Sequence, residues 1–245
     1  FQDLRMERRT RTFEDSSDSD AMNAIISQHG LTAEIDVDGT THRVPTQVNQ
    51  SDLAFLRERA AAVDAELWLD DRTLHIQARA RRAAGTVALT YGAGLLEFTV
   101  LADLAHQRSA LRVSGWDVAG KEAIDVEAGE SAVSSELAQG GRSGGATLSR
   151  ALAQRTERAG LATPLSQQEA QALADAGYRR RARRFLTGAG VADGNPAIQV
   201  GATLELRGVG PLFEGKYTVT LARHTYELLN GYRTTFEVQR PGIGG

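Results

Sequence analysis

Apolar and polar residues alternate along the last part of the chain, between residues 196 and 240. Every second position is apolar in a set that comprises Leu204, Leu206, Tyr217, Val219, Leu221, Phe236 and Val238. Such alternation is typical of strands with one buried face. Turn residues separate the runs at Gly208, Gly210-Pro211, Glu214-Gly215 and Asn230-Gly231. The Asn-Gly pair suits the positive φ angles of a tight hairpin, and the segment predicts a small antiparallel β-barrel.

A different pattern, with both helical and strand periodicity, covers residues 16–84. Asp20 is expected to cap a first helix that ends at Gly30, and Ser51-Asp52 opens a second. The expected elements in chain order are a helix over 19–30, a strand over 31–37, a hairpin at Asp38-Gly39 into 42–44, a helix over 51–63, and strands over 67–69 and 74–76 around a turn at Asp70-Asp71. This arrangement predicts a compact α/β domain.

The middle of the chain is the least regular part. Residues 85–123 have strand character and are assigned to the barrel. Residues 126–146 are rich in Ser, Gly, Ala and Glu, which favours a flexible loop. Helical patterns follow over 148–159 and 166–186, and Ser166 with Glu169 has the spacing of a capping box.

Composition narrows the class of protein. The 245 residues include 28 Lys and Arg against 31 Asp and Glu, and 41% are hydrophobic. The chain can bury a core, and no global basic field attracts nucleic acid. It has no cysteine, which excludes disulfides, thiolate nucleophiles and cysteine-based metal sites. No apolar run reaches the roughly 18 residues of a membrane span. The chain begins at Phe1 rather than Met, and we expect it to be part of a longer protein.

Several common catalytic motifs are absent from the sequence. There is no His-Glu-x-x-His, Walker or EF-hand pattern. None of the five histidines pairs with another at ligand spacing, so all are interpreted as structural: His29, His42, His75, His106 and His224. The carboxylate pairs Asp36/Asp38 and Asp70-Asp71 suit a glycosidase in principle, but turn positions explain them better. We predict no catalytic residue, no cofactor and no metal.

Arginines form the strongest local charges. A run near the N-terminus, with Arg5, Arg8, Arg9 and Arg11, is interpreted as a solvated face. A second group ends the helix predicted over 166–186, where cations interact favourably with the helix dipole. It consists of Arg179, Arg180, Arg181, Arg183 and Arg184. We expect these five residues to contact an acidic surface of a partner or, in an assembly of several copies, to line its ring.

Three blocks of sequence resemble one known family, in the family's order. They are QSDLAFLRERAAAVDAELWLDDRTLHI, LRVSGWDVAGKEAI and GNPAIQVGATLELRGVGPLFEGKYTVTLARHTYELLNGYRTTFEVQR. The chain resembles the phage late control gene D family, the hub proteins of contractile tails and contractile injection systems, which are related to VgrG. The family's GWD segment matches at Trp116, which is therefore interpreted as a core or seam aromatic.

The resemblance implies a β-rich α+β fold: a small antiparallel β-barrel of the hub type, a compact α/β domain and an inserted helix. The implied boundaries are 1–15 for the end of an upstream β-barrel, 16–84 for the α/β domain, 85–123 and 196–240 for the barrel strands, 124–195 for a flexible loop and helical insertion, and 241–245 for a tail.

A structural function follows from the same resemblance. Three copies would form a homotrimeric ring that joins an inner tube to a central spike, with trimer contacts from the barrel strands. The implied partners are two further copies, a spike or tip protein, an inner-tube or tube-initiator protein and baseplate wedge proteins, with no membrane and no nucleic acid. Assembly in the cytoplasm into a phage tail or a related particle is expected, without enzymatic activity.

Two other classes of protein remain open. A VgrG-type effector-carrying or wall-degrading tail enzyme would cleave peptidoglycan. An OB-like nucleic-acid-binding domain would use the Arg-rich helix and bind single-stranded DNA in a salt-dependent way, although a pI near 6.0 argues against it.

Overall fold

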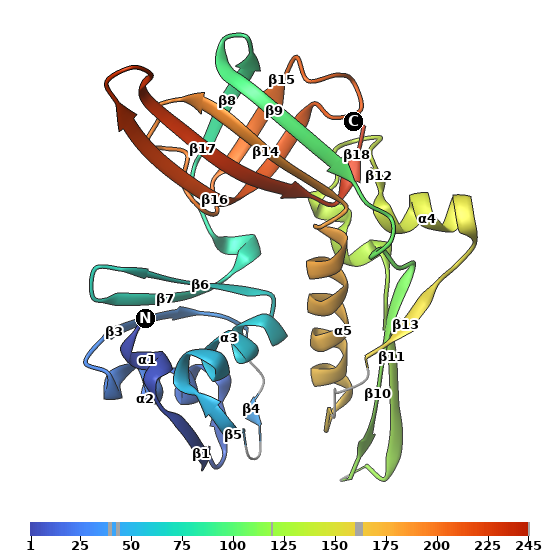
Figure 1. The fold of residues 1–245 in the computed structure, drawn as a ribbon. Coiled ribbons are helices and arrows are strands. Elements are labelled where there is room, and N and C mark those ends of the chain that lie inside the picture. Colours follow the sequence, from blue (N-terminus) through green and yellow to red (C-terminus); the bar gives the residue numbers. More distant parts are fainter. Residues whose placement is uncertain (39–40, 43–44, 119, 160–163, 245) are drawn as a thin grey trace. The chain divides into compact units, whose positions relative to one another are not determined.

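Strand pairing separates a small α/β part of the chain from a β-barrel part. The computed structural model describes residues 1–38, 41–42, 45–118, 120–159 and 164–244, and its ribbon is drawn in Figure 1. The chain forms two compact units. Unit 1 comprises Phe1–Arg82, Val113–Val126 and Leu161–Gly177, and unit 2 comprises Ala83–Arg112, Glu127–Gly160 and Tyr178–Gly245.

Unit 1 contains the α/β arrangement that the sequence predicts. Its elements over Phe1–Arg82 are α1 (Asp3–Met6), β1 (Arg8–Thr12), β2 (Ser16–Ser17), α2 (Asp18–Gln28), β3 (Thr32–Asp36), β4 (Thr41–His42), β5 (Thr46–Ser51), α3 (Asp52–Ala62), β6 (Ala65–Asp70), β7 (Thr73–Ala78) and a 3₁₀ turn over Arg79–Arg81. β6 and β7 form an antiparallel hairpin, and β3 pairs with β7 in parallel. β1 pairs with β5, and β2 pairs with β4.

Helices α2 and α3 start at side-chain caps. Ser17 is the N-cap of α2, and its hydroxyl and the Asp20 carboxylate exchange hydrogen bonds with each other's backbone amides. The expected cap is therefore shifted, because Asp20 is the N3 partner of a capping box. The Ser51 hydroxyl accepts the Ala54 N–H at the start of α3.

The core of unit 1 lies between the helices and the three-stranded sheet, and Figure 1 shows α2 and α3 on one side of that sheet. The buried set is Leu4, Met22, Ile25, Ile26, Leu53, Phe55, Leu56, Ala60, Leu74 and Ile76. Leu4 belongs to this core, and β1 pairs with β5. Residues 1–12 are thus part of the α/β unit, whereas the sequence placed 1–15 at the end of an upstream barrel.

The predicted hairpin at Asp38-Gly39 falls partly on residues 39–40 and 43–44, which lie outside the described residues. The described strand β4 pairs with β2.

Unit 2 is organised around a closed six-stranded barrel of mixed strand direction. Its strands are β8 (Thr86–Tyr91), β9 (Gly94–Ala102), β14 (Leu186–Asp193), β15 (Thr203–Arg207), β16 (Gly215–Glu227) and β17 (Gly231–Arg240). Their order around the barrel is β14-β17-β16-β15-β8-β9. The pairs of β8 with β15 and with β9 are parallel, so the expectation of a purely antiparallel barrel is wrong. The connection from β14 to β15 brings β15 next to β8, which comes much earlier in the sequence.

The apolar side chains of the predicted alternation fill the barrel core, except where the alternation shifts by one residue. Leu204, Leu206, Tyr217, Val219, Phe236 and Val238 are all buried in its core. Leu221 is instead exposed, because the register of β16 against β17 shifts between Val219 and Leu221. The extra residue of this β-bulge moves the following side chains to the opposite face, so Ala222 packs on the core in place of Leu221.

Strand β14 closes the barrel, although the sequence assigned it to the insertion. It pairs with β17 on one side and with β9 on the other. Its glycines make room for aromatic rings: a Cβ at Gly190 would lie 2.7 Å from the Phe236 ring, and one at Gly188 would lie 2.7 Å from the Phe98 ring. Glycine weakens the strand signal in the sequence, which explains the error.

The segment between the barrel strands is more ordered than predicted. It contains β10 (Ala110–Asp117), β11 (Glu122–Ala128), a 3₁₀ helix over Glu130–Glu136, β12 (Arg142–Ser143), α4 (Gly144–Leu152), β13 (Thr156–Arg158) and α5 (Gln167–Ala182), and β18 (Gly242–Ile243) follows the barrel. β10, β11 and β13 form a sheet separate from the barrel, so the assignment of 85–123 to barrel strands holds only for β8 and β9. Val133 of the 3₁₀ helix is fully buried, and residues 126–146 therefore do not form a flexible loop.

Candidate functional site

The arginine cluster at the end of α5 is largely occupied within unit 2. Arg183 is buried and forms an ion pair with Glu136, with 2.6 Å between Nη2 and Oε1. Arg181 pairs with Glu157 of β13, its Nη2 lying 2.6 Å from Oε1. These hydrogen bonds lower the pKa of the Glu157 carboxyl. The Arg179 Nε donates to the carbonyl of Ala132 at 2.8 Å.

These contacts change the hypothesis about the five arginines. Arg179, Arg181 and Arg183 fasten the end of α5 to the 3₁₀ helix and to β13. Arg180 and Arg184 are exposed. Only these two side chains are therefore retained as candidate contacts with a partner.

The N-terminal arginines also have partners inside the chain. Arg11 Nη2 lies 2.6 Å from Oδ1 of the buried Asp52, and His29 Nε2 lies 2.8 Å from Oδ2. Burial raises the pKa of the Asp52 carboxyl, but hydrogen bonds from His29 and Gln47 and the charge of Arg11 outweigh it, so that the pKa is lowered. For His29 burial lowers the pKa, and the hydrogen bonds to Asp52 and Asp3 outweigh it, so that the pKa is raised. Arg11 is thus anchored to a buried carboxylate, whereas Arg5 and Arg8 are exposed, as a solvated face requires.

His75 and His224 take structural positions. His75 stacks on Trp68 with 4.8 Å between ring centres and pairs with Glu34 at 2.7 Å. His224 Nδ1 lies 3.1 Å from the hydroxyls of Thr234 and Tyr232. Within the described part of the chain, no group of three or more His, Asp or Glu side chains is arranged to hold a metal ion, and no helix is long and apolar enough to cross a membrane.

The carboxylate pairs considered for glycosidase chemistry have other surroundings. Asp71 has a φ of 47° in the turn between β6 and β7, as the turn interpretation predicts. Asp36 and Asp38 both pair with Arg81.

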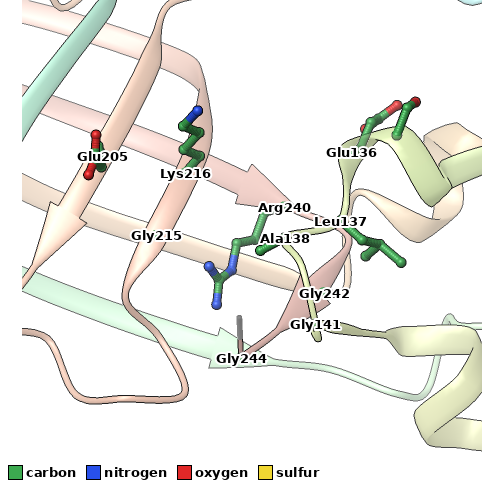
Figure 2. A pocket seen from close by; sticks show the side chains of 11 residues that line it. Glu136, Leu137, Ala138, Gly141, Glu205, Gly215, Lys216, Arg240, Gly242 and Gly244 are labelled. Atoms are coloured by element: carbon green, nitrogen blue, oxygen red, sulfur yellow. The ribbon is translucent and has the colours of Figure 1, made fainter.

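A cavity at one end of the barrel was not anticipated from the sequence. Its volume is about 380 Å³, and it lies between β15, β16, the end of β17, the segment around β18 and the end of the 3₁₀ helix. Figure 2 shows the Arg240 side chain extending from β17 into this space, with Gly141, Gly215 and Gly244 around it and Lys216 and Glu205 at its rim. We call it the Arg240 cavity.

The β16–β17 hairpin exposes apolar side chains at its tip. Leu228 and Leu229 are 98% and 92% exposed, and Tyr226 beside them is 76% exposed. The turn is at the expected place but is wider than a two-residue Asn-Gly hairpin, because Glu227 pairs with Gly231, whose φ is 68°. Trp116 in β10 is 54% exposed, so it is not a core residue of this chain.

Comparisons with solved structures give the fold a context. The 43 kDa tail protein of prophage MuSo2 from Shewanella oneidensis superposes with a TM-score of 0.72 and 13% identity, over 98% of this chain and 70% of that one. The tail protein from Neisseria meningitidis MC58 gives 0.67 and 10% identity, over 96% and 70%. The E. coli c3393 protein, described as a component of the type VI secretion system with structural similarity to the T4 bacteriophage tail proteins gp27 and gp5, gives 0.53 and 10% identity, over 97% and 52%.

These likenesses confirm the resemblance to phage tail and VgrG-related proteins at the level of the fold. No curated protein matches the sequence. A protein family described as the Alg8 N-terminal domain matches residues 2–227. Since this match spans most of the chain, the chain belongs to the Alg8 N-terminal domain family.

Proposed function

We propose that the chain is a structural hub of a contractile tail or injection-system baseplate, a homotrimeric ring that joins the inner tube to the central spike. The observation that carries the proposal is the shared fold with a prophage tail protein over 98% of the chain. The likeness to a component of the type VI secretion system adds support. The chain would assemble in the cytoplasm into a phage tail or a similar particle.

The barrel suggests how copies would meet. A closed barrel pairs all of its strand edges, so neighbouring copies must contact one another through outer faces and loops. Leu228 and Leu229 project from a hairpin that extends the barrel strands. Adjacent, almost fully exposed leucines favour a protein contact over a solvated tip. A hairpin of one copy against the barrel wall of the next is a heterologous contact, which forms a ring when the rotation between copies closes.

Partner proteins would use a different part of unit 2. Arg180 and Arg184 offer two exposed positive charges at the end of α5. We propose that they face an acidic surface of a tube, wedge or spike protein. Exchange of both for Glu would then impair particle assembly and leave the folded chain intact, whereas unchanged assembly would rule this contact out.

The mass of the protein in solution tests the ring. Native mass spectrometry of the purified chain should show a species of three times 26.3 kDa. A mass of 26.3 kDa at all protein concentrations, alone and with tail proteins, would contradict the proposal. Cleavage of peptidoglycan would favour a tail enzyme instead, and salt-dependent binding of single-stranded DNA would favour a nucleic-acid-binding domain.

A further inference from the structure

Arg240 is a buried cation whose hydrogen bonds are incomplete. The residue is 6% exposed. Its Nη1 donates to the Glu214 carbonyl at 2.7 Å, and its Nη2 donates to the Leu212 carbonyl at 2.8 Å. Its Nε is buried and has no acceptor among the described residues. Since buried charges are normally paired and buried donors normally bonded, this guanidinium has capacity for an anionic acceptor.

The fold holds Arg240 in one place. The two carbonyls fix its terminal nitrogens, and the Tyr217 ring centre lies 4.7 Å from its Cζ. Gly215 has a φ of 121°, and a Cβ there would lie 2.7 Å from Nη1. The absence of a side chain at Gly215 is therefore required for this position of the guanidinium. A donor fixed in this way is preorganised for binding.

The charges around the Arg240 cavity leave an excess of positive charge. Glu136 is bound by Arg183, and Glu205 is bound by Arg207 at 2.7 Å. Within the described residues, neither Arg240 nor Lys216 has a carboxylate oxygen within 4.0 Å. Both acidic side chains of the cavity are thus paired with other arginines. Lys216 lies opposite Glu205 in the β15–β16 pairing, and Arg207 and then Lys216 lower the pKa of that carboxyl. Arg240 pairs with neither acidic side chain.

We propose that the Arg240 cavity binds a carboxylate, with Arg240 as the anchor and Lys216 as a charge at the rim. A planar carboxylate would accept from the second N–H of each terminal nitrogen, since each donates only one hydrogen bond among the described residues, and such two-point contacts are the geometry that guanidinium groups favour. A volume of about 380 Å³ is larger than a bare carboxylate requires and accommodates an acidic side chain with part of its backbone. The occupant is therefore an Asp or Glu of a protein segment. That this segment belongs to a tail partner rests on the proposed function.

Isothermal titration of the chain with matched peptides tests the site. One peptide carries a central Glu between Gly and Ser residues, and the other carries Gln at that position. The Glu peptide should bind, and the Gln peptide should bind roughly ten- to a hundredfold more weakly, because a hydrogen bond to a charged group is lost. Equal binding would overturn the proposal. Acetate binding as tightly as the Glu peptide would overturn a protein segment as the source, and phosphate binding more tightly than both would overturn the carboxylate.

Variants locate the binding. Arg240→Gln should abolish the preference for Glu, and near-ultraviolet circular dichroism checks that the variant keeps its tertiary structure. Lys216→Ala should weaken binding a few-fold and reduce its dependence on salt. Lys121, the other lysine of the chain, lies in the β10–β11 turn and gives the matched control Lys121→Ala, which should bind as the unmodified chain does.

A second measurement does not depend on Arg240 variants. A zero-length carbodiimide reagent should link the Glu peptide to Lys216 in preference to Lys121, as mapped by mass spectrometry. Equal labelling of the two lysines would contradict the site. If the chain binds the peptide but does not assemble into a ring, only the proposed hub function is refuted. If it assembles but does not bind the peptide, only the proposed binding in the Arg240 cavity is refuted.

Discussion

The ion pair between Arg183 and Glu136 predicts an asymmetric response to mutation. The Arg183 side chain is 5% exposed and that of Glu136 is 28% exposed. Nε donates to both carboxylate oxygens, at 3.1 and 2.8 Å, and Nη2 donates to Oε1 at 2.6 Å. Glu136→Gln leaves the guanidinium buried beside a neutral amide, which should cost about 3 kcal/mol of unfolding free energy. Arg183→Met removes the buried charge and keeps an apolar side chain in its place, and water can hydrate the Glu136 carboxylate. We therefore expect this variant to lose roughly 1 kcal/mol of unfolding free energy.

The two units carry separate spectroscopic probes for this test. Both tryptophans, Trp68 and Trp116, belong to unit 1, and all five tyrosines belong to unit 2. In urea titrations the tyrosine bands of near-ultraviolet circular dichroism should follow the loss in unit 2, and tryptophan fluorescence should follow unit 1. The exposed neighbour gives the control Arg184→Gln, which should change stability by less than about 0.5 kcal/mol. A loss in Glu136→Gln no greater than that in Arg183→Met would refute the reasoning.

Three further predictions concern other parts of the molecule. His29→Gln should lower the unfolding free energy more at about pH 5.5 than at about pH 8.5, because a raised pKa contributes fully below the ordinary histidine value and is lost as the pH rises through the folded value; equal losses in urea titrations would contradict it. Gly190→Val should cost about 1–3 kcal/mol, since its Cβ would lie 2.6 Å from the Glu97 carbonyl oxygen, and thermal melts should show no comparable loss in the exposed neighbour variant Ala189→Val. Leu228→Asp combined with Leu229→Asp should shift the native mass from trimer to monomer, whereas Leu152→Asp, also at an exposed leucine, should leave the trimer intact; an unchanged mass in the double variant would exclude the hairpin tip as the contact.

The sequence predicts those parts of the fold in which burial is periodic. The inward positions of β15 and β17 follow strict alternation, and the two main helices of unit 1 carry apolar faces, with the cap of α3 in the expected segment and that of α2 at Ser17 instead of Asp20. The Asn-Gly and Asp-Asp turns were equally visible because positive φ angles select these residue types. Alternation fails at Leu221 because a bulge adds one residue to the strand. The pattern of apolar residues in the sequence does not reveal where this bulge lies.

Long-range pairing accounts for the remaining errors in the fold. β14 lacks large residues because rings from other strands fill the barrel opposite its glycines. β10 and β11 have the same strand character as β8 and β9, and only tertiary contacts decide that they form another sheet. The parallel pairing of β8 with β15 joins segments more than a hundred residues apart in sequence.

The candidate sites also depend on contacts between residues far apart in sequence. Five clustered arginines look alike in sequence, and only the positions of Glu136, Glu157 and the Ala132 carbonyl distinguish three inward ones from two exposed ones. Arg240 was a strand residue of no particular note in the sequence. Its burial and its proximity to Lys216 follow from strand order, so no local signal predicts the cavity.

Electron cryo-microscopy of the protein assembled with its tube and spike partners tests the central claim most directly. The account predicts a ring of three copies of this chain between a tube and a spike, with the β16–β17 hairpin of each copy against its neighbour. A single copy of the chain at that position, or its location away from the junction of tube and spike, would contradict the account.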